Sequence, residues 1–135
     1  MVSDRELSNR LLLRARDAMD RRYRDELDIA ALAEIACVSQ AHFIRRFKAT
    51  FGETPHRYLQ RRRVERAMYM LRTTTDDITD ICMNVGFSSL GTFSRTFTEI
   101  VGETPTRYRT QGTLCYVPSC FVKAWTRPSS FGEAR

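Results

Sequence analysis

A segment of twenty residues occurs twice in this chain, with the two copies fifty residues apart. The first copy, SQAHFIRRFKATFGETPHRY, runs from Ser39 to Tyr58. The second, SLGTFSRTFTEIVGETPTRY, runs from Ser89 to Tyr108 and is identical at ten of the twenty positions. A fixed-period repeat in a short chain means that one supersecondary unit has been used twice. The sequence therefore predicts two similar structural units within 135 residues.

Each copy predicts a helix, a sharp end and the start of a second helix. Ser39 stands before an apolar-periodic run, which suits an N-cap, and Phe43 and Phe47 fall on one helical face. Gly52 suits the left-handed position that ends a helix, and the Thr54–Pro55 pair suits the cap and first position of the next one. The same residue types recur fifty positions later, so the second copy makes the same prediction.

If the phenylalanines face the core, the opposite side of the first repeated helix is basic and free of acidic residues. That side carries Ala41, Arg45 and Lys48, flanked by His42 and Ile44. The second helix exposes Gly91, Arg95 and Thr98, flanked by Thr92 and Ser94. The long side chain that both outer faces share is the repeated arginine, Arg45 or Arg95.

A shorter helix is predicted before the first repeated helix. Asp28 is a plausible N-cap for residues 29–36, whose apolar side is rich in small residues, and Cys37–Val38 forms a brief turn before Ser39. This order is the helix-turn-helix layout. Further upstream, residues 3–22 form an amphipathic helix whose predicted core stripe is Leu7, Leu11, Ala15 and Met19.

The same succession is predicted in the second half. Thr75 or Asp76 caps a short helix, Gly86 provides the turn, and Ser88 or Ser89 opens the next helix. The two short helices match each other at a separation of 49 positions, whereas the two repeated helices match at 50. The second turn, at Gly86, therefore carries one extra residue. Between the halves, a helix is predicted from Pro55 to about Arg72, with apolar residues over a wide arc of its surface. This breadth predicts that the helix contacts both halves and fixes the distance between them. Its arginine run at 61–63 is interpreted as a solvated or partly buried face.

Composition favours a polyanionic partner, because the formal charge is +6 and the pI is near 9.5. Only Lys48 and Lys123 among the 22 basic residues are lysine. Arginine suits bidentate contacts to phosphate or guanine, although a GC-rich genome explains the bias equally well. The four cysteines have no CxxC spacing, and no catalytic constellation or phosphate-binding loop is present. The sequence therefore predicts a reduced, cytoplasmic protein that is not an enzyme and has no metal, cofactor, signal peptide or membrane segment.

The chain resembles the DNA-binding domain of AraC/XylS transcription regulators over residues 27–109. The second-half segment ITDICMNVGFSSLGTFSRTFTEIVGETPTRYR is similar to the family signature almost from end to end, and LAEIACVSQAHFIRRFKATFGETPHRYL matches in the first half. The resemblance implies an all-α fold with two helix-turn-helix lobes joined by a long linker helix, about seven helices in total. The implied division is residues 1–53 and 74–109 for the lobes, 54–73 for the linker and 110–135 for an irregular tail.

The resemblance also implies a bacterial, sequence-specific regulator of transcription that inserts its two recognition helices into successive major grooves of double-stranded DNA. The DNA-binding residues implied or weighed on these faces are Gln40, Ala41, His42, Ile44, Arg45, Lys48, Leu90, Gly91, Ser94, Arg95 and Thr98. Binding as a monomer, association with the nucleoid and contact with RNA polymerase are further expectations. The alternative is a helical protein-interaction module, for example one that recruits RNA polymerase, with only nonspecific affinity for DNA. A stand-alone two-lobe regulator and the C-terminal fragment of a longer one both fit the sequence.

Overall fold

The computed structural model describes residues 3–111, and every regular element in that range is an α-helix. The chain divides into two compact units, the first ending at Leu59 and the second beginning at Gln60. The helices are α1 (Asp4–Arg21), α2 (Ile29–Ala36), α3 (Gln40–Phe51), α4 (Pro55–Thr73), α5 (Ile78–Asn84), α6 (Leu90–Val101) and α7 (Pro105–Gln111). The predicted all-α fold of about seven helices is confirmed over the described range. Expectations for residues 112–135 lie outside the described residues, and the assignment of residues 54–73 as a separate linker stays a prediction.

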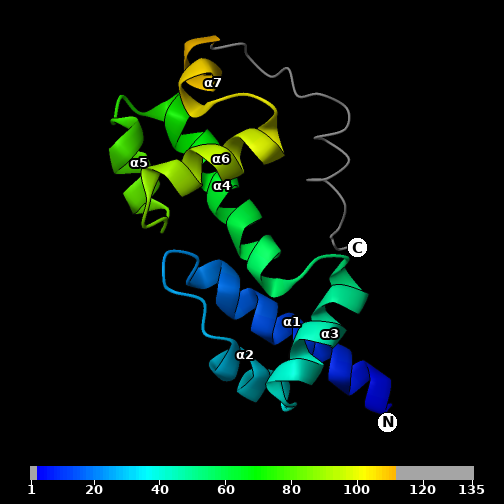
Figure 1. Cartoon of the computed structure of the whole chain (residues 1–135). Coiled ribbons are helices and arrows are strands. Elements are labelled where there is room, and N and C mark those ends of the chain that lie inside the picture. Colours follow the sequence, from blue (N-terminus) through cyan, green and yellow to red (C-terminus); the bar gives the residue numbers. More distant parts are fainter. Residues whose placement is uncertain (1–2, 112–135) are drawn as a thin grey trace. The chain divides into compact units, whose positions relative to one another are not determined.

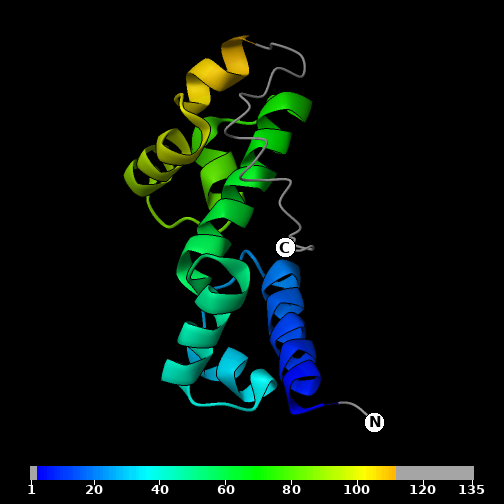
Figure 2. The same cartoon turned by 90° about the vertical axis from the view of Figure 1, so that its right-hand side faces the viewer.

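In the first unit, α2 and α3 both pack against α1 (Figure 1 and Figure 2). The buried core consists of Leu12, Ala15, Met19, Leu32, Ala33, Ala36, Phe43, Phe47, Tyr58 and Leu59. Removal of this apolar surface from water is the main favourable term in folding. The alanines of α2 leave room for close approach to its neighbours, and the aromatic rings of α3 fill the centre.

The predicted stripe on α1 is partly wrong. Leu7 is 51% exposed and Leu11 is half-buried, whereas Leu12, Ala15 and Met19 are buried. A strict four-residue spacing advances 400° and therefore drifts 40° around the helix at each step. The true core face alternates between spacings of three and four, and Leu7 falls about 110° from its centre. Ser3 begins the helix as predicted, since its side chain accepts a hydrogen bond from the Glu6 amide.

The end of α2 shows how the chain turns toward α3. Cys37 has a left-handed backbone with a φ of 60°, and the Val38 amide bonds back to the Ala33 carbonyl at 3.0 Å. Gly86, just after the C-cap of α5, also has a positive φ, 104°, and the Phe87 amide bonds to the Cys82 carbonyl at 3.1 Å. These bonds satisfy carbonyls that the helix end leaves open. Residues 37–39 connect the first pair of helices and residues 85–89 connect the second. The second connection is therefore longer by two residues: one is the predicted extra residue, and the other arises because α5 ends one residue earlier than α2 does.

In the second unit, α6 contacts both α5 and α7 (Figure 1). The buried residues of α5 and α6 include Ile81, Cys82, Phe93 and Phe97, and Val64, Ala67 and Leu71 of α4 are also buried. The expected cap of α5 at Thr75 or Asp76 is wrong. The N-cap is Asp77, and its side chain makes no capping hydrogen bond. The preceding backbone is held in another way, by an arginine from α7 that is described below.

Candidate nucleic-acid interface

Helix α3 is fixed at both ends and along one side, which leaves the other side to solvent. The Ser39 hydroxyl accepts a hydrogen bond from the His42 amide at 3.2 Å, and Gly52 ends the helix with a left-handed φ of 82°. Phe43 and Phe47 are fully buried, with ring centroids 5.7 Å apart. All of the predicted contact residues of this helix are exposed: Gln40, Ala41, His42, Ile44, Arg45 and Lys48.

Helix α6 repeats this construction in the second unit. The Ser89 hydroxyl accepts from the Thr92 amide at 3.2 Å, and Phe93 and Phe97 are again fully buried with centroids 5.7 Å apart. The predicted outer face carries Leu90, Gly91, Arg95 and Thr98, which are exposed, and Ser94, which is half-buried. Each unit thus presents one helix whose core side and solvent side are set by the same repeated residues.

The repeated arginines are available for an external ligand. Arg45 and Arg95 are exposed, and neither guanidinium has a hydrogen bond or ion pair with any other residue in the range 3–111. The neighbouring Arg46 behaves differently, because it is half-buried and donates to the Asn9 side chain at 3.1 Å. A guanidinium keeps its charge at any physiological pH and offers five donors in a planar fork, which matches phosphate and guanine edges.

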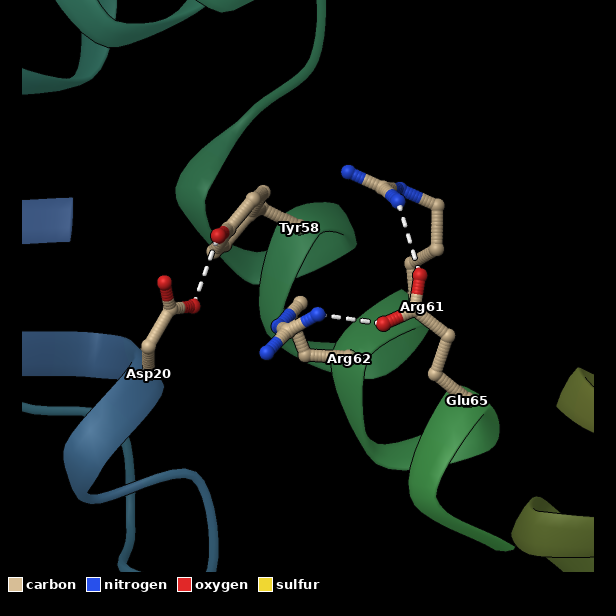
Figure 3. Close-up of polar contacts among 5 residues, drawn as sticks. All are labelled: Asp20, Tyr58, Arg61, Arg62 and Glu65. Carbon is tan, nitrogen blue, oxygen red and sulfur yellow. Dashed lines mark hydrogen bonds and ion pairs between the residues drawn. The ribbon is translucent and has the colours of Figure 1, made fainter. Parts of the chain in front are cut away.

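The basic run of α4 is partly neutralised by an acid on the same helix. Figure 3 shows Glu65 between Arg61 and Arg62, and each arginine pairs with one of its carboxylate oxygens. The Arg61 contact measures 3.5 Å, and residues 61–63 are all half-buried. The interpretation of this run as a partly buried face therefore agrees with the structure, and it is a weaker candidate for DNA contact than Arg45 or Arg95.

The tyrosine that closes each repeat braces its own unit, as predicted. The Tyr58 hydroxyl donates to the Asp20 carboxylate at 2.6 Å (Figure 3). The Tyr108 hydroxyl accepts from Arg72 Nε at 2.7 Å, and the Arg72 guanidinium also lies 4.6 Å from the centre of that ring. These bonds tie the segment after each exposed helix to another helix of the same unit, which limits how far the helix can shift.

Residues 3–111 contain neither a metal-binding cluster nor a membrane-spanning helix. That range contains no group of three or more histidine, cysteine, aspartate or glutamate side chains placed to hold a metal ion. None of its helices combines the length and apolar character needed to cross a membrane.

Comparison with known proteins identifies the family. A family model described as a helix-turn-helix domain matches residues 32–111, which is more than half of the chain. The chain belongs to the AraC-type helix-turn-helix family. The matched range begins within α2 and ends with α7, so it contains both exposed helices and their supports.

Solved AraC-type structures share the fold. An AraC-type DNA-binding domain protein from Chromobacterium violaceum is 29% identical with a TM-score of 0.73, and the match covers 81% of this chain and 97% of that one. The DNA-binding domain of AdpA, described as a global transcriptional factor, was solved in complex with a target DNA. It is 26% identical with a TM-score of 0.69, over 74% of this chain and 90% of that one.

Curated relatives are longer than the matched domain. An uncharacterized HTH-type transcriptional regulator of Staphylococcus aureus (strain COL) is 33% identical over 93 residues, which is 69% of this chain but 12% of the relative. The probable transcriptional regulator LumQ of Photobacterium leiognathi is 32% identical over 84 residues, which is 62% of this chain and 34% of LumQ. The match thus spans from about an eighth to a third of the length of these relatives.

One supporting residue of the AraC-type domain was missed by sequence reasoning. Arg109, on α7, donates to the carbonyls of Leu71 at 3.2 Å, Thr74 at 3.1 Å and Asp76 at 2.5 Å. It thereby closes the end of α4 and fixes the segment that leads into α5. No local pattern identifies such a residue, because its three acceptors are backbone atoms more than thirty positions away.

Proposed function

We propose that this AraC-type domain binds double-stranded DNA sequence-specifically and regulates transcription, with α3 and α6 as recognition helices in successive major grooves. The observation that carries the proposal is the repeated arginine. Arg45 and Arg95 occupy equivalent positions on two capped, core-anchored helices, and both are exposed without a partner in residues 3–111. The solved complex of the related AdpA domain with its target DNA supports the same role.

The geometry of a single helix also fits this role. A major groove admits one α-helix, and residues near the N-terminus of a recognition helix contact base edges in helix-turn-helix proteins. The proposed contacts lie from the first residue of each helix onward, on the side opposite the buried phenylalanines. Arg45 and Arg95 are the proposed guanine contacts, and Lys48, a turn farther along α3, is a proposed phosphate contact. The Thr98 hydroxyl donates to the Ser94 carbonyl at 2.7 Å, so its proposed contact with a phosphate requires exchange of that hydrogen bond.

Binding as a single copy and a cytoplasmic, nucleoid-associated location are parts of this proposal. The charge of +6 supports attraction to a polyanion at low salt. Contact with RNA polymerase is a further part, and it needs a surface other than the recognition faces. Tyr69 and Met83 are large exposed apolar side chains outside α3 and α6, and they are available for such a contact.

The alternative function is a protein-interaction module with only nonspecific affinity for DNA. One observation favours it: among the five contact residues predicted on α6, only Arg95 is charged. The two functions differ in how binding responds to salt. A specific binder keeps a large preference for one duplex over random DNA as salt rises, whereas nonspecific affinity falls steeply for every sequence.

The test starts with selection of bound duplexes from a random pool by the purified chain. Arg45→Ala and Arg95→Ala should each weaken binding to the selected duplex by about 1 to 3 kcal/mol and relax the preference at one guanine, because each removes a bidentate contact. Binding to random DNA should change little. Fluorescence anisotropy at several salt concentrations measures both affinities.

Arg14→Ala is the matched control, since Arg14 is an exposed arginine on α1 rather than on a recognition helix. It should leave the preference for the selected duplex unchanged. If the Arg45 and Arg95 variants lose the same binding affinity for selected and for random DNA, these arginines contact only phosphates. If no duplex is enriched at all, the protein-interaction function is the better one.

A further inference from the structure

Helices α3 and α6 can be compared position by position. Both contain twelve residues, both have a serine N-cap and a glycine C-cap, and the phenylalanine pairs in both are fully buried at the same ring separation. Residues fifty apart therefore occupy equivalent places on the two outer faces. Arg45 and Arg95 are one such pair, and differences at the other places decide what each helix can distinguish.

At two of these places the polar and apolar residue types are interchanged between α3 and α6. The first residue of α3 is Gln40, which is polar, and the equivalent residue of α6 is Leu90, which is 44% exposed. One helical turn later, α3 carries Ile44, which is 38% exposed, and α6 carries Ser94. Along α3 the order is polar and then apolar, and along α6 it is apolar and then polar.

The apolar group that base edges present in the major groove is the 5-methyl group of thymine, which suits contact with an apolar side chain. Gln40 can instead hydrogen-bond an adenine edge, and Ser94 can bond to several bases. Four residues along a helix cover about 6 Å, whereas successive base pairs are about 3.4 Å apart. The exchange therefore moves the thymine contact by about two base pairs relative to the base contacted by the repeated arginine.

We infer that α3 and α6 read two different half-sites. Each half-site contains a guanine, but the essential thymine lies at a different distance from that guanine in each. Ile44 contacts a thymine close to the guanine of Arg45, and Leu90 contacts a thymine about two base pairs farther from the guanine of Arg95. The target is then an asymmetric site rather than a repeat of one sequence. This inference rests on the proposed function, since it names the DNA feature that the same two helices recognise.

Deoxyuridine substitution tests the inference directly, because deoxyuridine lacks only the 5-methyl group. In the selected duplex, each thymine is replaced in turn, and the half-sites are assigned to helices by the guanine whose preference is relaxed in Arg45→Ala or Arg95→Ala. Loss of one methyl contact should weaken binding about fourfold, because that factor corresponds to the transfer free energy of one buried methyl group. One such thymine is expected in each half-site.

The variants link each thymine to one side chain. Ile44→Ala should abolish the effect of deoxyuridine in the α3 half-site and leave the α6 half-site sensitive, and Leu90→Ala should do the reverse. Matched controls are Ile35→Ala and Leu13→Ala, since these residues are 37% and 41% exposed but lie outside both recognition helices. Both controls should retain full sensitivity in both half-sites.

Exchange of the chemistry gives a second, independent readout. The double variant Gln40→Leu/Ile44→Ser gives α3 the residue types of α6, so selection with it should yield two half-sites with the same spacing of guanine and thymine. The inference is overturned if no thymine is sensitive, if Ile44→Ala keeps the sensitivity of the α3 half-site, or if the double variant selects the original site. Failure of the proposed function is a different result, namely no preference for any duplex over random DNA.

Discussion

Arg109 holds the segment of the second unit that joins the end of α4 to the start of α5. Its guanidinium donates to the carbonyls of Leu71, Thr74 and Asp76, and α5, which begins just after this segment, has no side-chain cap of its own. Arg109→Met keeps an apolar stem of similar length but removes all three donors. We expect the segment before α5 to loosen while α6 keeps its buried phenylalanines.

The magnitude follows from the environment of the three bonds. A typical intramolecular hydrogen bond contributes about 1 kcal/mol net, because the freed carbonyl can bond to water instead. Two of the three bonds are part-buried and the one to Asp76 is exposed, so the expected loss is about 2 kcal/mol. At a urea dependence of about 2 kcal/mol per M, the unfolding midpoint should fall by about 1 M.

Urea unfolding followed by circular dichroism measures this shift, and hydrogen exchange shows where it arises. The amides of α5 should exchange faster in Arg109→Met than in the parent chain. Arg107→Met is the control, since Arg107 is an exposed arginine two residues earlier on the same helix. An unchanged midpoint together with intact protection of α5 would refute the reasoning that Arg109 replaces the missing cap.

Two further predictions concern the backbone and the thiols. Gly52→Ala should destabilise the first unit by about 1 kcal/mol, because alanine is strained at a φ of 82° even though an added Cβ meets no atom within 4 Å. Gly91→Ala, inside α6, should instead stabilise by about 1 kcal/mol, because an added Cβ would meet only the Ser89 hydroxyl oxygen at 3.7 Å, an ordinary van der Waals contact. Thermal unfolding that gave both changes the same sign would contradict this. With the two cysteines beyond residue 111 replaced by serine, a thiol reagent at pH 8 should label the exposed Cys37 quickly and Cys82 only on unfolding. Burial shields Cys82 and raises the pKa of its thiol, so equal labelling rates would show that this thiol is accessible.

The candidate site was predictable to a large extent because its residues follow local rules. Helix periodicity placed Phe43 and Phe47 inside and therefore Arg45 outside, and the structure places all three accordingly. The errors arose where a local rule was too simple. A fixed spacing of four misplaced Leu7 on α1, and a preference for capping residues misplaced the start of α5, where Asp77 lacks a capping bond.

The sequence alone determined the repeated helix-turn-helix pattern, since caps, left-handed glycines and a 3.6-residue period act within a few residues of the chain. It also identified the two outward arginines, because burial of one helical side dictates exposure of the opposite one. Only the tertiary structure decided which arginines are already engaged: Arg46 with Asn9, Arg72 with Tyr108 and Arg109 with distant carbonyls. Those bonds join residues more than thirty positions apart, and such partners become neighbours only when the hydrophobic cores have brought the helices together.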